Sequence, residues 1–504
     1  MPTLRRIYTM YLLYNLLLIL LVTITLPFWL YKVVTKEKHR IGFWEKLGIT
    51  EEGPPASVCH PEIVSGSQMK AGFSPGKGSS RIHIHTVSVG EVIAATPFIK
   101  ELRQRHPEVR LTLSTVTPTG NEVARKRLPE VDQILYSPFD LPWSVKRFIS
   151  RVKPDIYVSV ETELWPNFLR EVKRSGARSL IINGRISPDA FKGYRMFRCF
   201  MKGVLSNVDI FCMQSDEDAE RIREIGASAG SVTVTGNMKY DQKFIEMDGD
   251  AVSAKRRFYG IGKDDKVIVA GSTHPGEDEA IISAYLECQK DDEKPACTPP
   301  VCHPEFISGS QTMPGEEIPK QGRDDRGDDR GMGFSDEKLR LIIVPRHIER
   351  TADIERIVKS KGLDVIRRTE LNNSEKNDVP YGTVIVVDTI GELSTLYSIA
   401  TVVIIGGSII PHGGQNPLEA MYYRKPLIFG KHMFNFKQIT EEILESGAGL
   451  MIEDKDSLKD ALQGLLNNNG KQQEMGEKGY KIIAKNRGAV ERNLAIIEKL
   501  LMLR

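Results

Sequence analysis

Two segments in the first half of the chain carry carboxylates with the residue types and spacing for acid–base chemistry. Glu91 ends the motif Ser88–Glu91, which follows a short apolar segment, and Gly90 allows a tight turn into a helix. A glutamate in the first turn of a helix either stabilises that helix or serves as a general base. Glu161 and Glu163 follow a second apolar segment, where a charged side chain is costly without a partner. A structural pair and a functional pair are both consistent with these two residues.

Cationic and glycine-rich segments indicate phosphate binding. Lys239 either offers positive charge to a leaving phosphate or is a solvated linker lysine. Arg346 carries the planar set of donors that grips a phosphate. Glycines let backbone N–H groups approach a phosphate, and they recur after predicted strands in segments 271–277, 406–408 and 413–419.

The last of these glycine-rich segments leads into a helix start. Asn416 and Pro417 suit the cap and the first position of a helix. Glu419 then falls in the first turn, where it could accept hydrogen bonds from a ribose diol. The sequence has no GxxxxGK[ST] motif, which argues against a P-loop ATPase.

Strand-like and helix-like patterns alternate along both halves of the chain and must position these residues. Short apolar segments predict strands at 81–87, 109–114, 155–160, 179–182, 208–213 and 232–235, and again at 267–270, 339–344, 384–387, 401–405 and 426–429. Strands that alternate with helices predict parallel sheets covered by helices on both faces. We therefore predict an α/β protein of two doubly wound domains with a cleft between them, and ligands bound beyond the carboxyl ends of the strands.

The first 40 residues differ from the rest of the chain. Residues 7–30 are almost wholly apolar, which is long enough for a helix to span a bilayer. More basic residues follow this segment than precede it, which favours a cytoplasmic location for the remaining chain. A helix lying in one leaflet is the alternative. We expect a membrane anchor at 1–40, an N-terminal domain at 41–240 with an insertion at about 51–80, and a C-terminal domain at 241–504 with a disordered insertion at about 290–336.

Charge and cysteine usage limit the classes of function. The formal net charge is +3, from 69 basic and 66 acidic residues, so nothing demands a nucleic-acid partner. Cys199, Cys212 and Cys288 lie in apolar contexts typical of reduced core cysteines. Both insertions carry a repeated Val-Cys-His-Pro-Glu segment, but adjacent Cys59-His60 and Cys302-His303 pairs lack the usual spacing of zinc ligands.

As an ordered set, the motifs resemble those of the 3-deoxy-D-manno-octulosonic acid (Kdo) transferases. The resemblance extends from the anchor to about residue 490 apart from the two insertions, and it rests on segments 88–91, 117–120, 161–167, 234–239, 344–347, 391–393, 406–408, 416–419 and 434–436. It implies a glycosyltransferase B-type (GT-B) fold with two Rossmann-like domains, an acceptor site in the first and a CMP-sugar site in the second. Gln415 departs from the family, which commonly has histidine before Asn416.

The resemblance also implies an activity and a set of roles. Kdo would pass from CMP-Kdo to lipid IVA, a lipid A precursor, with release of CMP, at the cytoplasmic face of the inner membrane in lipopolysaccharide core biosynthesis. Glu91 would be the general base, and Glu161 and Lys239 would stabilise the transition state. Since CMP carries one phosphate, no metal and no other cofactor is expected. CMP would be held by Pro345, Arg346, Ile390, Gly391, Glu392, Asn416, Pro417, Leu418 and Glu419.

Three other interpretations of the sequence stay open. The first is a transferase of the same fold that uses another nucleotide sugar. The second is a non-catalytic, membrane-tethered binding protein that has kept the fold. The third is a scaffold organised by zinc on the two Cys-His repeats.

Overall fold

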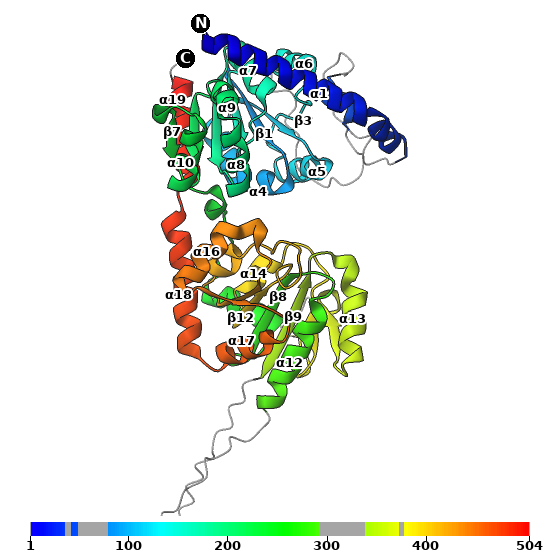
Figure 1. Ribbon diagram of the computed structural model, residues 1–504. Coiled ribbons are helices and arrows are strands. Elements are labelled where there is room, and N and C mark those ends of the chain that lie inside the picture. The colour runs from blue at the N-terminus through cyan, green and yellow to red at the C-terminus, as the bar shows by residue number, and fades with distance from the viewer. Residues whose placement is uncertain (1, 36–41, 49–78, 293–337, 372–376, 503–504) are drawn as a thin grey trace, which may run out of the picture. The chain divides into compact units, whose positions relative to one another are not determined.

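Two seven-stranded parallel sheets, one in each half of the chain, form the framework of the protein (Figure 1). The computed structural model describes residues 2–35, 42–48, 79–292, 338–371 and 377–502. These residues form two compact units, of which the first contains Met1–Lys243 with Lys485–Arg504 and the second contains Phe244–Ala484. The predicted insertions at about 51–80 and 290–336, with both Cys-His repeats, lie almost wholly outside the described residues.

The first sheet has the strand order β3-β2-β1-β4-β5-β6-β7, and all neighbouring strands are parallel. Most of its strands are short apolar segments with few exposed positions, as expected for strands covered on both faces. The strands are β1 (Arg81–Thr86), β2 (Arg110–Thr115), β3 (Gln133–Tyr136), β4 (Ile156–Val160), β5 (Arg178–Gly184), β6 (Ile210–Met213) and β7 (Val232–Val234).

Helices pack on this sheet and enclose two apolar cores. Several of them begin at a proline, whose fixed φ and missing N–H suit the first turn of a helix. The helices that follow the strands are α4 (Val89–Arg105), α5 (Pro118–Arg127), α6 (Pro142–Val152), α7 (Pro166–Arg174), α8 (Pro188–Met196), α9 (Arg198–Leu205) and α10 (Asp216–Ile225), and a short 3₁₀ helix, η2 (Met238–Asp241), follows β7.

The C-terminal helix α19 (Ala489–Met502) returns to the first unit and packs against α4 and η2. The carboxylate of Asp241 accepts hydrogen bonds from the backbone N–H groups of Gly488 (2.6 Å) and Val490 (2.6 Å), which fixes the start of the returning segment. Arg105 of α4 pairs with Glu491 of α19 at 2.5 Å. Nothing in the sequence pattern indicates this return, because it depends on contacts between residues far apart in the chain.

The second sheet repeats the architecture with the order β10-β11-β9-β8-β12-β13-β14, again with parallel neighbours. The two doubly wound parallel units confirm the predicted fold class. The short edge strands β3, β10 and β14 were not predicted, because few residues carry their pattern. The strands are β8 (Lys266–Thr273), β9 (Leu339–Pro345), β10 (Val365–Arg367), β11 (Val384–Val386), β12 (Val402–Ile405), β13 (Leu427–Gly430) and β14 (Gly449–Ile452).

A third apolar core lies between this sheet and its helices. The helices of the second half are α11 (Gly249–Phe258), α12 (Asp278–Asp292), α13 (Thr351–Ser360), α14 (Leu393–Tyr397), α15 (Leu418–Tyr422), α16 (Lys437–Ser446), α17 (Ser457–Leu466) and α18 (Asn469–Asn486). Cys212 and Cys288 are buried as predicted. The prediction for Cys199 was wrong: this residue is exposed, because α9 turns Met201, Val204 and Leu205 toward the core instead.

The N-terminal helix α1 (Pro2–Thr35) belongs to the first unit. Among the described residues it is the one helix long and apolar enough to cross a membrane, by length and composition, over Thr9–Trp29. Figure 1 shows it running across the first unit beside α7 and α9, and Tyr11 is buried there with 4% of its surface exposed.

The fully buried carboxylate of Glu277 joins the loops that follow β8 and β12. It accepts hydrogen bonds from four backbone N–H groups: His274 (2.9 Å), Gly407 (2.7 Å), Ser408 (3.1 Å) and Ile409 (3.0 Å). A buried charge is tolerated when donors surround it in this way. The loops after two neighbouring strands are therefore held together from the inside.

We expect Glu277→Ala to destabilise the second unit by roughly 2–4 kcal/mol, because four buried N–H groups lose their acceptor. Glu279→Ala is the matched control, since Glu279 lies two residues along in an exposed ion pair with Lys361 (3.5 Å). Chemical denaturation of both variants measures the effect. Equal stability of the two variants would show that Glu277 does not hold the loops.

Candidate functional site

The strand order of the first sheet reverses beside β1, which lies between β2 and β4. Loops that leave the carboxyl ends of strands at such a reversal diverge, and ligands of open α/β sheets bind there. Glu91 follows β1 and Glu161 follows β4, so the two carboxylates predicted from the sequence flank the reversal. The structure therefore brings these two residues together from segments 70 positions apart in the chain.

Glu91 is held at the first turn of α4 with 7% of its surface exposed. Its carboxylate accepts hydrogen bonds from the backbone N–H of Val87 (2.6 Å) and from the hydroxyl of Ser88 (3.2 Å). Burial, with a smaller contribution from the negative charge of Glu161, raises the pKa of Glu91 to about 8 against the lowering effect of the Val87 hydrogen bond. A carboxyl group with such a pKa exchanges protons near neutral pH, as a general base must.

The segment after β4 leaves the sheet at Glu161. Its backbone N–H still bonds to the carbonyl of Ile182 (2.9 Å), while its φ of 61° lies in the left-handed region that a non-glycine residue rarely adopts. The carboxylate of Glu163 accepts a hydrogen bond from the indole N–H of Trp165 (2.8 Å), and burial raises its pKa. Backbone strain of this kind gathers at functional sites, which favours the functional interpretation of Glu161.

Lys239 lies in η2, which packs against α4, the helix that carries Glu91. The side-chain oxygen of Asn183, at the end of β5, accepts a hydrogen bond from the backbone N–H of Met238 (2.9 Å). The backbone N–H of Lys239 in turn bonds to the side chain of Asn237 (3.0 Å). These contacts fix the turn of Lys239 to the same carboxyl edge of the sheet. Asn183 was not predicted as a site residue, although its φ of 54° marks it as unusual.

The predicted CMP-binding residues follow strands β9, β11 and β12, at one edge of the second sheet. The side chain of Arg346 is exposed just after β9, while its backbone N–H bonds to the carbonyl of Thr273 at the end of β8 (3.0 Å). Pro345 ends β9 and is buried. The Arg346 guanidinium is therefore presented to solvent beyond the strand ends, where an anion can reach it.

The predicted residues after β11 differ in what their side chains do. Ile390 is 86% exposed, and Gly391 adopts a φ of 99°, which suits glycine. The carboxylate of Glu392 accepts hydrogen bonds from Tyr259 (2.9 Å) and Arg368 (2.9 Å). Burial disfavours the charged form of Glu392, but hydrogen bonds, including that from Arg368, outweigh this effect and lower its pKa. Glu392 is thus an ionised carboxylate already engaged within the protein.

The segment Asn416–Glu419 forms the start of α15. The side-chain oxygen of Asn416 accepts a hydrogen bond from the backbone N–H of Leu418 (3.1 Å), and its amide nitrogen lies 3.4 Å from a carboxylate oxygen of Glu419. Leu418 is fully buried, so its side chain belongs to the core. Pro417 precedes the helix with φ −81°. Of the four, the polar side chains of Asn416 and Glu419 have the chemistry to contact a ligand.

Three histidines gather at this edge, and the sequence analysis assigned no role to them. The His274 ring lies 3.9 Å from the ring centroid of His412 and 6.2 Å from that of His347. Gln415, at the position where histidine was expected, places its amide nitrogen 3.2 Å from His274 Nε2. Burial, together with the neighbouring His412 and His347, lowers the pKa of His274 to about 4. His274 is therefore neutral, and only its position at a strand end could have pointed to it.

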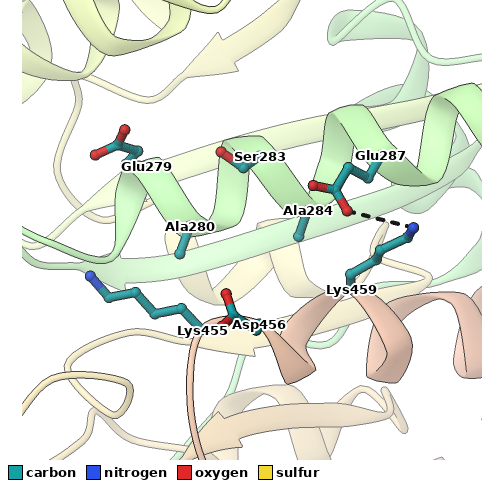
Figure 2. Close-up of a pocket in the computed structure, with 8 residues that line it drawn as sticks. All are labelled: Glu279, Ala280, Ser283, Ala284, Glu287, Lys455, Asp456 and Lys459. Carbon is teal, nitrogen blue, oxygen red and sulfur yellow. Dashed lines mark ion pairs between the residues drawn. The ribbon is translucent and has the colours of Figure 1, made fainter.

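A polar groove elsewhere in the second unit contains none of the predicted residues. Figure 2 shows it between α12 and α17, where an ion pair joins Lys459 to Glu287 (3.5 Å). Exposed ion pairs contribute little binding energy or stability, so we assign no function to this groove. It is lined by Glu279, Ala280, Ser283, Ala284, Glu287, Lys455, Asp456 and Lys459.

The described part of the chain has no group of three or more His, Cys, Asp or Glu side chains arranged to hold a metal ion. The zinc interpretation concerned Cys59, His60, Cys302 and His303, and these residues lie outside the described ranges.

Comparisons with known proteins match both halves of the chain. Residues 42–242 match the family described as 3-deoxy-D-manno-octulosonic-acid transferase (kdotransferase), and residues 381–482 match glycosyl transferases group 1. Among solved structures, the C-terminal CMP-Kdo binding domain of WaaA from Acinetobacter baumannii is 22% identical and covers 46% of this chain and 96% of its own, with a TM-score of 0.34.

Two curated relatives extend the match over most of the sequence. The 3-deoxy-D-manno-octulosonic acid transferase of Chlamydia pneumoniae is 26% identical over 474 residues, which is 92% of this chain and 91% of the relative. That of Haemophilus influenzae is 30% identical over 421 residues, which is 83% of this chain and 86% of the relative. The edge residues described above thus belong to a glycosyltransferase, and the chain is a member of the 3-deoxy-D-manno-octulosonic acid (Kdo) transferase family.

Proposed function

We propose that the protein transfers Kdo from CMP-Kdo to lipid IVA, a lipid A precursor, and releases CMP, in the synthesis of the lipopolysaccharide core. The observation that carries the proposal is the buried Glu91, whose pKa is raised to about 8 beside Glu161, in a chain of the Kdo transferase family. We assign Kdo as the transferred group from the names of the relatives. The donor nucleotide and the lipid acceptor are part of the proposal.

In this mechanism Glu91 is the general base. A hydroxyl of the acceptor attacks the anomeric carbon of Kdo, and Glu91 takes the hydroxyl proton as the new C–O bond forms. Its hydrogen bonds from Val87 and Ser88 fix the carboxylate at the first turn of α4. The burial that raises its pKa also excludes water, which would otherwise compete as the nucleophile.

The bond that breaks joins the anomeric carbon to a phosphate oxygen of CMP. Positive charge develops on the sugar ring and negative charge on the departing phosphate. The carboxylate of Glu161 stabilises the positive charge on the sugar ring, and Lys239 and Arg346 stabilise the negative charge on the phosphate. CMP leaves with the electron pair of that bond and a single phosphate, so the mechanism requires no metal to bridge a diphosphate.

CMP itself is assigned to the edge of the second sheet. The exposed Arg346 suits the phosphate, and the Asn416 and Glu419 side chains suit the hydroxyl groups of a ribose. The backbone at Pro345, Ile390, Gly391, Pro417 and Leu418 completes the proposed contacts. Glu392 takes a supporting part, because its carboxylate is held by Arg368 and Tyr259.

A lipid acceptor explains why the enzyme would carry the apolar helix α1. We place the protein at the cytoplasmic face of the inner membrane, where a nucleotide-activated sugar made in the cytoplasm meets a membrane-bound precursor. The direct test is incubation of the purified full chain with lipid IVA and a donor-generating system, read by mass spectrometry. Mass increments of whole Kdo units support the proposal, and an unchanged acceptor with a well-folded enzyme contradicts it.

Glu91→Gln should abolish the general base, so we expect the transfer rate to fall on the order of 10²–10⁴-fold. The same change should stabilise the fold at high pH. The folded-state pKa of about 8 lies above the ordinary value of 4.5, so the wild type loses stability as pH rises between these values, and a neutral side chain does not.

The measurement is the melting temperature of Glu91→Gln and wild type at pH 5 and pH 9, beside the transfer rate. Glu101→Gln is the control, because Glu101 lies on the same helix in a partly exposed pair with Arg105. A Glu91→Gln variant that kept the wild-type transfer rate would show that Glu91 is not the general base.

The acidic limb of the pH profile should report Glu91. We expect kcat/KM of the wild type to rise with pH to a midpoint near 8, since only the ionised base accepts a proton. Glu161→Gln removes a neighbouring negative charge, which should move the midpoint to lower pH as well as slow the reaction. A midpoint that does not move in Glu161→Gln would contradict the electrostatic coupling of the two carboxylates.

Arg346→Ala should raise the KM for CMP-Kdo by about 10-fold or more, and Arg346→Lys should restore part of the loss, because lysine keeps the charge without the planar fork. Arg356→Ala controls for loss of surface charge, as Arg356 is exposed on α13. Competition by CMP and by UDP in the same assay identifies the nucleotide. Stronger inhibition by UDP would favour a different sugar donor.

A further inference from the structure

One face of α1 lies along the first unit. Tyr11, Tyr14, Leu18, Val22 and Thr25 are buried or half-buried, and their spacing of three or four residues places them in one stripe of the helix. At about 1.5 Å per residue the stripe is about 21 Å long. Figure 1 shows the N-terminal part of α1 running across the unit beside α7. Of this stripe, Tyr11 belongs to the apolar core of the unit, with 4% of its surface exposed.

Polar contacts lock this stripe to the unit. The hydroxyl of Tyr14 donates to the carboxylate of Asp140 (2.9 Å), and the side-chain amide of Asn167 donates to that of Asn15 (2.6 Å). Asp140 is itself 3% exposed and accepts hydrogen bonds from the backbone N–H groups of Asn167 (3.0 Å) and Phe168 (2.8 Å). These two hydrogen bonds, Tyr14–Asp140 and Asn15–Asn167, are called the lock. Because Asp140 is part of the folded core, breaking the lock would leave buried polar groups without partners.

Aromatic contacts extend the same attachment. The ring of Phe200 on α9 lies 5.3 Å from Tyr11 and 5.8 Å from Tyr14. The Arg170 guanidinium lies over the Tyr11 ring at 4.7 Å, and the Tyr11 hydroxyl reaches the carbonyl of Pro166 (3.4 Å). The aromatic rings bury apolar area in this contact, and the Tyr11 hydroxyl fixes the orientation of its ring through a hydrogen bond.

The opposite face of α1 is apolar and exposed. The segment Thr9–Trp29 has a mean hydropathy of 2.1, and a face of this length far exceeds the apolar patches that soluble surfaces carry. At its C-terminal end Lys32 lies over the ring of Phe28 (4.3 Å) next to Trp29, a pairing of aromatic and basic groups typical of the membrane interface. This exposed leucine face consists of Leu12, Leu13, Leu16, Leu17, Leu20, Leu21, Ile24 and Phe28.

A helix that crosses a bilayer is surrounded by lipid or protein through about 30 Å of hydrocarbon. Crossing by α1 while the lock is closed would carry Asp140, Asn167 and the nearby backbone to the same depth, where polar groups are expensive. A helix embedded in one leaflet avoids this cost, because its outward face meets acyl chains and its inward face stays on the protein. The lock and the exposed face are satisfied together only in that orientation.

We propose that α1 lies in the plane of the membrane, in one leaflet, with Tyr11, Tyr14 and Asn15 fixed to the first unit and its exposed apolar face in lipid. This inference rests on the membrane association given under the proposed function. It replaces the predicted single crossing and places both ends of α1 on the same side of the membrane. The first unit is then attached to the bilayer surface rigidly, through the helix itself.

The test is the side of the membrane on which the N-terminus lies. The full chain is expressed in Gram-negative cells with an epitope tag joined to Met1 by a flexible Gly-Ser linker, and protease is added to spheroplasts or to inverted inner-membrane vesicles. We expect the tag to be cleaved in the vesicles and protected in the spheroplasts. Cleavage in the spheroplasts would mean that α1 crosses the membrane, and would overturn the inference.

The double variant Tyr14→Phe/Asn15→Leu tests the lock, because it removes both polar contacts and makes the helix more apolar. We expect part of its tag to become accessible in spheroplasts. Thr23→Val is the matched control, since the Thr23 hydroxyl bonds only within the helix, to the carbonyl of Ile19 (2.8 Å) among the described contacts. A double variant that behaves as the wild type would show that these contacts do not set the orientation.

Kdo transfer by the same vesicles separates this inference from the proposed function. Transfer by a protein whose tag faces outward would overturn only the orientation, and a cytoplasmic tag without transfer would overturn only the activity. Recovery of the chain as a soluble oligomer without detergent would overturn the membrane assignment, because the leucine face would then be an interface between copies.

Discussion

The reversal of strand order beside the first strand of each sheet is the constraint on which both candidate sites depend. In the first sheet the reversal lies between the neighbouring strands β1 and β4, and in the second it lies between the neighbouring strands β8 and β12. The crossover connections run in opposite directions from these points, so the loops after the paired strands diverge and leave their backbone groups uncovered. Residues that follow these strands therefore meet at one edge although the chain separates them widely. Glu91, Glu161, Glu277 and Gly407 all occupy such positions.

The two reversals hold glutamates with opposite properties. Glu277 is surrounded by four backbone donors, so its charge is compensated and its oxygen atoms are used within the protein. Glu91 has one backbone donor and one hydroxyl, and a second carboxylate faces it. Compensation makes the first residue structural, whereas the uncompensated burial of the second raises its pKa, which suits the proton transfer proposed for it. The same place in the fold thus supports stability in one unit and the proposed chemistry in the other.

The sequence predicted the features that depend on local pattern. Apolar segments located most strands, and the motifs around Glu91, Glu161 and Arg346 marked strand ends before the order of the strands was known. Features that depend on distant partners were missed. The histidine cluster joins three strand ends, three of the four donors to Glu277 lie 130 to 132 positions away, and the return of α19 needs Asp241. The contacts of α1 with the first unit were also missed, because Tyr14 and Asn15 interrupt an apolar segment without showing which protein groups they contact.

The segment between β4 and α7 connects the proposed chemistry to the proposed membrane contact. The charge of Glu161 at its start raises the pKa of Glu91. At the start of α7, the carbonyl of Pro166 accepts a hydrogen bond from Tyr11, and the side-chain amide of Asn167 donates one to Asn15 of α1. Glu163 and Trp165 bond to each other between these points and brace the segment (2.8 Å). Glu161, which the proposed mechanism uses, and Asn167, which contacts α1, are therefore six positions apart in the chain. Because this segment holds α1, the two proposals are coupled: if α1 lies in one leaflet, its depth would also set the height of Glu91 above a lipid acceptor.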